Sequence, residues 1–453
     1  MTTSPHDEMH SAETPVPVPT AVQRRRTLGA SFIGTAIEWY DFFIYGAAAS
    51  LIFGPQFFPS DNPVAGTLAA FATFAIGFLA RPVGGIVMGH YGDTVGRKAM
   101  LLISMLLMGG ATVGIGLLPN FAAIGVWAPI LLVTLRFVQG LGVGGEWGGA
   151  VLMAVEYAPA NKRTLYGAFP QMGLPAGIMA SNIVFIIVTN IIAPEAFAAW
   201  GWRLPFLLSG ALIVVALFLR LKVEETPSFK KTKLNNEVDQ SPLATVMKNH
   251  GMTVFIAGAV SIACPAIGYL YSVYLLSYGT TELGIARPTM LWLIVAGAAV
   301  QLVTIYFAAV LADRTDQRKV FLAGAVLVTL WAFPFFLLID TAQPLLIFVA
   351  FAVMLLGSSL MAGPQAALIA HLFPANVRYS GTSIAYQIGS IAGGGFAPLI
   401  AVSLFAAFNS TIPVSTYLFV LGAISLVSVV FLGRGRDADR SGSIASADRT
   451  PVR

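Results

Sequence analysis

The sequence predicts an all-α polytopic membrane protein of twelve transmembrane helices, arranged as two pseudo-symmetric halves of six helices each. Three observations support this prediction. The composition is 57% hydrophobic and only 10% charged, whereas a soluble protein carries roughly a quarter charged residues. Long apolar segments recur along the chain, and polar loops repeat at similar spacing in its two halves. A chain with so few charges cannot cover a water-soluble globule, so lipid is the expected solvent.

Each expected span is an apolar segment long enough to cross about 30 Å of hydrocarbon. The spans of the first half lie near 27–52, 65–90, 99–118, 126–157, 164–192 and 203–221. Those of the second half lie near 251–279, 288–312, 319–339, 344–372, 379–407 and 413–433. Internal prolines such as Pro82 and Pro364 are tolerated in such helices where neighbours or water satisfy the freed carbonyl groups.

The basic residues predict the orientation of these spans. Of the 26 Lys and Arg residues, two lie within spans and two lie in loops on one side. The other 22 (26 − 4) lie on the opposite side, as expected for loops that face the cytoplasm. We therefore expect a multi-pass protein of the cell's inner or plasma membrane with both termini in the cytoplasm. The net charge of +5 reflects this topology, and no nucleic-acid partner is expected.

Polar segments divide the chain into expected domains. A disordered cytoplasmic tail without the apolar core of a signal peptide precedes the first half, a cytoplasmic loop separates the halves, and a cytoplasmic tail follows. The boundaries are 1–26, 27–221, 222–250, 251–433 and 434–453.

The two halves repeat each other's loops. The segment Asp93–Lys98 has a counterpart at Asp313–Lys319, 220 residues later (313 − 93). Likewise Pro159–Arg163 resembles Pro374–Arg378, 215 residues later (374 − 159). Two repeats of six helices are typical of transporters, which hold their substrate between the repeats near the middle of the bilayer.

Several motifs resemble those of one family. The loop from Gly89 to Lys98 is similar to the cytoplasmic signature of the major facilitator superfamily, although Thr94 stands where a basic residue is usual. Within that superfamily the chain resembles the metabolite:proton symporters over nearly its whole length outside the tails. The segments that carry this resemblance are Gly34–Phe42, Arg81–Gly85, Arg136–Gly140, Gly144–Trp147, Trp202–Phe206 and Glu224–Pro227.

The resemblance implies a secondary active transporter, not an enzyme, that takes up a small organic acid with protons by alternating access. Members carry shikimate, α-ketoglutarate, citrate, or proline and betaine, and the first and fourth spans look closest to the shikimate type. Symport of zwitterionic osmolytes and an uncoupled facilitator or exporter are the alternatives. The expected partners are protons, a small solute and the lipid bilayer. The protein is expected to work as a monomer, without cofactor or metal.

Ionisable residues inside spans are candidates for function because their burial in lipid is costly. They lie in the first half, at Glu38, Asp41, Arg81, Arg136 and Glu146. Glu38 and Asp41 are three residues apart and share a helix face with Tyr45. Glu38 lies roughly 18 Å along its helix from Arg26, and Arg136 roughly 15 Å into its span from the other side. These heights allow contact between the carboxylates and Arg136.

A buried carboxylate beside an arginine can alternate between a paired, ionised state and a protonated state, which proton coupling requires. Glu38, Asp41 and Glu146 are therefore the candidates for proton coupling, and a permanent ion pair that only fixes helix packing is the alternative. Arg136 is the preferred substrate ligand, and Arg81 could be a ligand, a gate or a packing partner. Further candidates for substrate contact are Tyr45, Gln139, Tyr271, Tyr274, Gln365 and Gln387; the second-half tyrosines could equally belong to an interfacial aromatic belt.

The repeated cytoplasmic loops are candidates for a latch between the halves that forms in one transport state, by charge pairs and helix dipoles. The residues concerned are Gly89, Asp93, Gly96, Arg97, Asp313 and Arg318, with simple charge anchoring as the alternative. The pattern from Gly140 to Gly145 matches the dinucleotide-binding motif, but it lies inside a span with no preceding strand. Gly140 and Gly144 instead indicate a face for close helix packing.

Overall fold

The computed structural model describes residues 21–94, 97–144, 151, 154–155, 158–221, 242–374 and 378–447. The elements in these ranges are helices, as predicted. Two predicted site residues, Gly96 and Glu146, lie outside the described residues. The backbone at Gly89, Asp93 and Arg97 is helical, but their surroundings lie outside the described part of the structure.

The first half contains the helices of spans one to six. The first span combines α1 (Ala21–Ala48), a π-helical turn (Ala49–Phe53) and α2 (Gly54–Phe57). The other elements are α3 (Pro63–Thr94), α4 (Arg97–Leu117), the short α5 (Phe121–Ile124), α6 (Trp127–Val143), α8 (Arg163–Ile191), the short α9 (Pro194–Ala199) and α10 (Leu204–Leu221).

The second half contains spans seven to twelve. The seventh span combines α12 (Pro242–Val260), α13 (Ala263–Tyr269), a π-helical turn (Leu270–Tyr274) and α14 (Leu275–Thr281). The eleventh combines α18 (Arg378–Ser390), a π-helical turn (Ile391–Gly395) and α19 (Ala397–Phe408). The remaining spans are α15 (Arg287–Arg314), α16 (Gln317–Ile339), α17 (Pro344–Ala370) and α20 (Ile412–Ala447).

The helices are long and apolar enough to cross a bilayer. Nine helical stretches of the described residues meet both criteria by themselves, and two shorter apolar helices, 102–117 and 127–143, match the third and fourth spans. With α1, which carries Glu38 and Asp41, they make up the twelve spans. Side chains that face outward are apolar, as lipid requires; Phe307 is 63% and Leu330 69% exposed.

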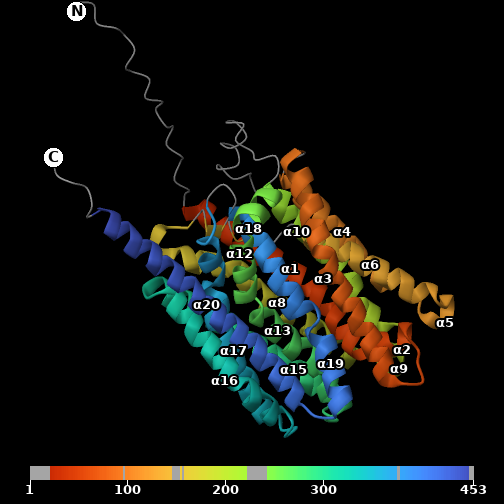
Figure 1. Cartoon of the computed structure of the whole chain (residues 1–453). Coiled ribbons are helices and arrows are strands. Elements are labelled where there is room, and N and C mark those ends of the chain that lie inside the picture. Colours follow the sequence, from red (N-terminus) through yellow and green to blue (C-terminus); the bar gives the residue numbers. More distant parts are fainter. Residues whose placement is uncertain are drawn as a thin grey trace, which may run out of the picture.

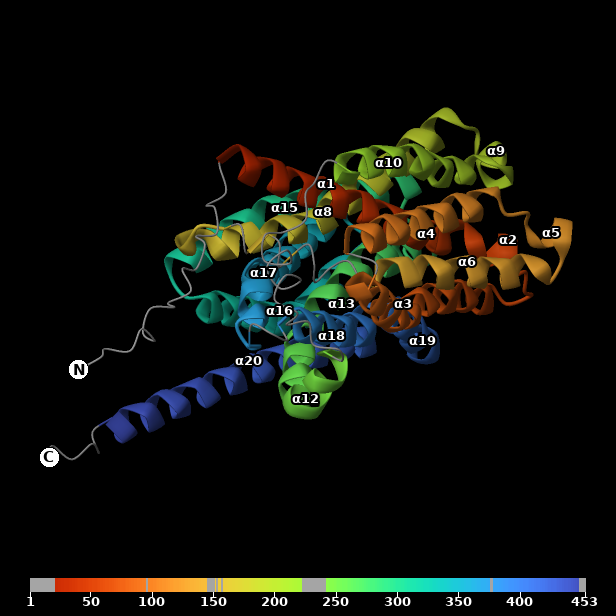
Figure 2. The same ribbon diagram turned by 90° about the horizontal axis from the view of Figure 1, so that it is seen from above.

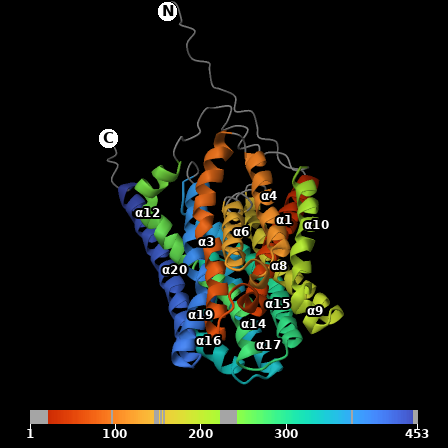
Figure 3. The ribbon, with the colours of Figure 1, turned by 90° about the vertical axis from the view of Figure 1, so that its right-hand side faces the viewer.

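The helices lie side by side in one bundle (Figure 1). The start of α12 and the ends of α10 and α20 lie at one end of the bundle, while α9 lies at the other (Figure 3). Viewed along the bundle, α4, α6 and α10 lie on one side and α16, α17 and α20 on the other (Figure 2). Two elements are longer than expected, because α12 begins inside the predicted central loop and α20 continues through most of the predicted C-terminal tail.

The same helix pairing occurs twice, which confirms the predicted internal repeat. In the first half α4 packs against α6 and α10, and in the second half α16 packs against α17 and α20. The pairs α3–α6 and α15–α17 correspond in the same way, as do α1–α8 and α12–α18. The halves meet where α8 contacts α15 and α17, where α3 contacts the eleventh span, and where α1 contacts the seventh.

Small residues allow the closest helix contacts, as the sequence predicted. A Cβ atom on Gly140 would overlap the carbonyl oxygen of Gly77, and one on Gly144 would overlap that of Arg81. The backbones of α3 and α6 therefore touch, which is the packing that small residues permit in membranes. This contact brings Arg81 and Arg136 close to the same part of the bundle.

We expect Gly140→Ala to lower the thermal stability of the purified protein in detergent. The added methyl group has no space, and overpacking of this kind typically costs about 1–3 kcal/mol. Gly110→Ala is the matched control, because that glycine lies inside α4 with nothing within 4 Å of the added carbon. In a helix interior, alanine is favoured over glycine by roughly 1 kcal/mol. Equal unfolding temperatures for Gly140→Ala and the wild type would contradict this packing.

Candidate transport site

Three charged side chains are buried within the described part of the bundle, and all come from the first half, as predicted. Asp41 of α1 and Arg136 of α6 are fully buried, and Arg81 of α3 is 2% exposed. No water is available in the bilayer core to solvate such groups, so their protein partners determine what they can do. Within the described ranges, no three His, Cys, Asp or Glu side chains gather into a set that could hold a metal ion.

The Arg136 guanidinium lies among aromatic rings and keeps two nitrogen atoms unused. Its carbon lies 4.0 Å from the ring centroids of both Phe42 and Tyr45, and 4.9 Å from that of Phe74. Gly77 leaves room for it, because a Cβ there would lie 2.6 Å from Arg136 Nε. Nη1 donates to Gln139 at 2.5 Å. Nε and Nη2 have no hydrogen-bond partner among the described residues, so they are available to an anion.

Arg136 is connected to Asp41, one of the two first-span carboxyl groups, through Gln139 and Thr112 and not by a direct bond. Gln139 Nε2 donates to Thr112 Oγ1 at 2.9 Å, and Thr112 Oγ1 lies 3.5 Å from Asp41 Oδ2. Gln139 also donates to the backbone carbonyl of Asp41 at 3.4 Å. The heights along the helices were compatible with contact, but the rotation of α1 directs the Asp41 side chain toward α4. Asp41 Oδ1 has no hydrogen-bond partner among the described side chains.

Glu38 and Tyr45 lie on either side of Asp41 along α1. Glu38 is partly exposed and interacts electrostatically with Asp41. Tyr45 is fully buried. Its hydroxyl lies 2.5 Å from Thr73 Oγ1, and its ring packs against the Arg136 guanidinium. The hydroxyl of Thr73 donates to a backbone carbonyl, so Tyr45 is the donor in their mutual bond. Tyr45 therefore positions Arg136 through its ring, and its hydroxyl already has a partner.

Arg81 faces the second half. Its Nη1 donates to Ser390 of α18 at 3.4 Å, and its carbon lies 4.1 Å from the Phe78 centroid and 4.5 Å from the Phe42 centroid. Arg81 Nε and Nη2 have no hydrogen-bond partner among the described residues. Arg81 thus combines a contact between the halves with free donor groups.

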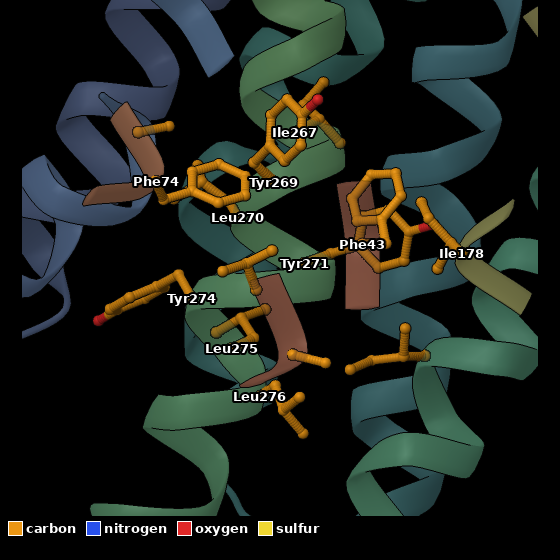
Figure 4. Packing of buried hydrophobic residues seen from close by; sticks show 14 of the residues in the cluster. Phe43, Phe74, Ile178, Ile267, Tyr269, Leu270, Tyr271, Tyr274, Leu275 and Leu276 are labelled. Atoms are coloured by element: carbon orange, nitrogen blue, oxygen red, sulfur yellow. The ribbon is translucent and has the colours of Figure 1, made fainter. Parts of the chain in front are cut away.

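Tyr269 is a site residue that the sequence reasoning missed. It ends α13 in the second half, yet its ring inserts among aromatic side chains of the first half (Figure 4). Its centroid lies 5.2–6.3 Å from the rings of Trp39, Phe42, Phe43, Phe74 and Phe78. Its hydroxyl faces the Arg81 guanidinium without forming a well-aligned hydrogen bond, and it interacts electrostatically with both arginines. In the sequence Tyr269 stands two residues before Tyr271 in a tyrosine-rich segment, but it does not share the helix face of Tyr271, Tyr274 and Tyr278, so nothing distinguished it.

The predicted substrate ligands Tyr271 and Tyr274 contact the second half instead. Tyr271 donates to Gln301 at 3.3 Å and packs against Phe351. Tyr274 stacks on Tyr278, with centroids 5.7 Å apart. Their partners lie inside the second half, away from the arginines, and these contacts are those of helix packing. Their role as substrate ligands stays a prediction.

Gln365 and Gln387 reach across to the first half. Gln365 Oε1 accepts from Gln171 of α8 at 3.4 Å, and Gln387 Nε2 donates to the carbonyl of Gly144 at 3.2 Å. Each amide keeps one atom, Nε2 of Gln365 and Oε1 of Gln387, without a partner in the described structure. Their position between the halves suits the predicted substrate contact, which stays a prediction.

Asp313 makes a contact between the halves at the predicted latch. Its two carboxylate oxygens accept from the backbone nitrogens of Thr164 and Leu165, both at 2.9 Å, in the first turn of α8. A carboxylate there also interacts favourably with the helix dipole. Arg318 behaves differently, because it donates to carbonyl groups of Val429 and Val430 in α20, within its own half.

The halves also touch at the other end of the bundle. Ser50 Oγ, in the π-helical turn after α1, donates to the carbonyl of Val273 in the seventh span at 2.8 Å. Together with the Asp313 contact, this hydrogen bond joins the two halves at two separate places along the bundle.

Two repeats of six membrane-spanning helices, with buried charges where the repeats meet, define a membrane transport protein. Comparison with known proteins agrees. Residues 27–254 match the family model "Sugar (and other) transporter", and residues 252–452 match "Major Facilitator Superfamily". The chain belongs to the major facilitator superfamily, as the sequence motifs indicated.

The curated relatives are transporters. The chain is 41% identical over 415 residues to an inner membrane metabolite transport protein of Escherichia coli strain K12, covering 90% of this chain and 93% of the relative. It is 40% identical to the shikimate transporter of the same strain, covering 85% and 88%. A proline/betaine transporter of that strain is 31% identical, covering 93% and 86%.

Solved structures share the fold. The crystal structure of a D-xylose-proton symporter aligns with a TM-score of 0.71 at 18% identity, covering 90% of this chain and 96% of that one. At this identity the likeness supports the fold alone.

We expect Asp313→Asn to loosen the contact between α8 and α15. The asparagine loses the charge that faces the helix dipole, an interaction worth about 1 kcal/mol, or roughly a fivefold shift in an equilibrium. In the variant, double electron–electron resonance between spin labels at the exposed positions Asn161 and Thr315 should show a larger fraction of long label-to-label distances. Asp316→Asn is the control, because Asp316 caps its own helix through Lys319 N and asparagine caps equally well. An unchanged distance distribution in Asp313→Asn would rule out the latch.

Proposed function

We propose that the protein takes up a small organic acid, such as shikimate or another mono-, di- or tricarboxylate, together with protons by alternating access. The observation that carries this proposal is the pair of buried guanidinium groups, Arg81 and Arg136, whose Nε and Nη2 atoms have no partner among the described residues. A buried cation without an anionic partner is costly. A carboxylate substrate would supply that partner, and the arginines would supply its counter-charge and planar hydrogen bonds.

The membrane and its orientation complete the proposal. The excess of basic residues in one set of loops supports cytoplasmic termini, and the relative that is 41% identical is named as an inner membrane protein. We infer an inner-membrane location with import as the direction. We further propose that the protein works as a monomer.

Asp41 is the proposed proton carrier, with Glu38 beside it and Glu146 as a further candidate. Ionised Asp41 compensates part of the positive charge of Arg136, to which it is connected through Thr112 and Gln139. A proton on Asp41 leaves the arginines with an uncompensated charge, which favours binding of an anion. By linkage, a bound anion then favours protonation equally, so the two uptakes are coupled.

Zwitterionic osmolytes are the second candidate, and one observation favours them. Aromatic rings bind quaternary ammonium groups, and the rings around Tyr269 form such a cluster. However, Arg81 and Arg136 already occupy faces of these rings, which disfavours a cationic group. Proton-driven accumulation of substrate in liposomes distinguishes a symporter from an uncoupled facilitator or exporter of the same fold.

We expect wild-type protein in liposomes to accumulate radiolabelled shikimate when an inward proton gradient is imposed, and a protonophore to abolish this accumulation. Asp41→Asn should lose accumulation but retain exchange of labelled for unlabelled substrate, because exchange needs no net proton movement. Asp340→Asn is the control, since Asp340 lies at the far end of α16, bonded to Tyr278 and Thr411. Accumulation of glycine betaine instead would establish the zwitterionic alternative. Equilibration without accumulation would establish a facilitator.

We expect Arg136→Lys to weaken substrate binding by about tenfold, because lysine keeps the charge but loses the planar pair of donors. The wild type should bind shikimate more tightly at acidic than at alkaline pH, since protonated Asp41 no longer competes for the arginines. Binding of labelled shikimate to purified protein across this pH range measures both effects. Arg287→Lys, outside the site at the start of α15, should match the wild type. Affinity that is flat with pH would argue against competition between substrate and Asp41.

A further inference from the structure

Four side chains form a continuous polar chain through the first half. Arg136 Nη1 donates to Gln139 Oε1 at 2.5 Å, Gln139 Nε2 donates to Thr112 Oγ1 at 2.9 Å, and Thr112 Oγ1 lies 3.5 Å from Asp41 Oδ2. All four residues are at most 1% exposed. The chain runs from α6 through α4 to α1, and it connects the buried cation to the buried carboxyl group.

The chemistry of its two ends fixes the direction of every bond. A guanidinium can only donate, and an ionised carboxylate can only accept. The Gln139 oxygen must therefore face Arg136, and its nitrogen must face Thr112. Thr112 accepts from Gln139 and has one hydrogen left to give. Each link then points from the cation toward the anion, and bonds aligned in this way strengthen one another.

The single hydroxyl hydrogen of Thr112 has two acceptors within reach. The carbonyl of Met108, one turn earlier in α4, lies at 2.9 Å, and Asp41 Oδ2 lies at 3.5 Å. Rotation about the Cβ–Oγ bond moves the hydrogen between them without moving a heavy atom. An ionised carboxylate attracts the hydrogen, because charge-assisted bonds are roughly twice as strong as neutral ones. A protonated carboxyl group loses that advantage, and the Met108 carbonyl takes the hydrogen.

We propose that Thr112 is the positioning residue that transmits the protonation state of Asp41 through Gln139 to Arg136. This inference rests on the proposed function and adds the route by which proton and substrate are coupled. With Asp41 ionised, the aligned chain holds Arg136 Nη1 on Gln139. When Asp41 takes a proton from one aqueous side, the chain loses its terminal acceptor, and Arg136 is released toward an anion. The proton later leaves Asp41 to the other side, and the O–H bond of Asp41 is the only covalent bond that forms and breaks.

Other groups face this chain, but none of them replaces it. Glu38 and Tyr40 on α1 act on Asp41 through their electrostatic fields, and Ser209 approaches it from α10. On the other side, Arg136 interacts electrostatically with Tyr45, Arg81 and Tyr269. Gln139 also donates to the backbone carbonyl of Asp41, but among the described residues it is Thr112 that connects Gln139 to the Asp41 carboxyl group, where the proton binds.

The test compares variants that differ at the hydroxyl group. Thr112→Val keeps the shape of the side chain and removes the hydroxyl, while Thr112→Ser keeps the hydroxyl. Thr329→Val is the matched control, because Thr329 lies 217 residues later (329 − 112) in α16, which occupies the equivalent place in the second half. Thr329 is buried and donates to a carbonyl of its own helix, Ala325 O, at 2.7 Å. The probe is radiolabelled shikimate, with purified variants in liposomes.

We expect the substrate exchange rate of Thr112→Val to lie within about twofold of that of the wild type. Its proton-driven accumulation of substrate should be about tenfold lower, as expected for a lost hydrogen bond to a charged group. Its substrate affinity should also become equal at acidic and alkaline pH. Thr112→Ser and Thr329→Val should behave as the wild type. A merely structural role for Thr112 would lower exchange and accumulation together.

Several outcomes overturn the inference. If the wild type accumulates shikimate and Thr112→Val does so equally, the inference fails while the proposed function stands. If Thr112→Ser loses coupling as Thr112→Val does, the hydroxyl is not responsible. If the wild type itself shows no proton-driven accumulation, the proposed function fails and the inference with it. If Thr112→Val does not fold, Thr112→Ala removes the same hydroxyl group and must show the same separation of exchange from accumulation.

Discussion

The bilayer provides no water to the middle of the bundle, and the rest of the structure follows from that constraint. A buried charge must find its partners within the protein. Arg136 does so with one hydrogen bond to Gln139 and the faces of Phe42 and Tyr45, which satisfies it only in part. The space for its side chain exists because Gly77 carries no Cβ. The close contact of α3 and α6 and the chemistry of the site are therefore consequences of the same packing.

The fold could be predicted from the sequence because its signals are additive over many residues. Twenty apolar residues define a span almost regardless of their order, and the loops with Asp93 and Asp313 repeat at a distance that reveals the two halves. The ends of α12 and α20 were less predictable. Outside the bilayer, polar residues can continue a helix, so hydropathy does not mark where the helix ends.

The site was only partly predictable, because height along a helix does not give rotation about its axis. Asp41, Arg81 and Arg136 are buried as expected, but Asp41 turns toward Thr112 on α4 and does not bond Arg136 directly. In the seventh span the π-helical turn from Leu270 to Tyr274 breaks the regular helical spacing, so residue spacing along one face does not give the direction of each side chain. Tyr269, which precedes this turn, enters the first half, whereas Tyr271 and Tyr274 contact their own half and stay predicted substrate ligands.

The π-helical turns also have a mechanical consequence. They interrupt the first, seventh and eleventh spans, at Ala49–Phe53, Leu270–Tyr274 and Ile391–Gly395. Each widens its helix locally, and such turns often occur at functional sites. A widened turn is a compliant joint in an otherwise stiff rod, so the segments beyond it can flex while the rods keep their hydrogen bonds. This bundle therefore combines stiff helical rods with short end segments that can flex separately from them.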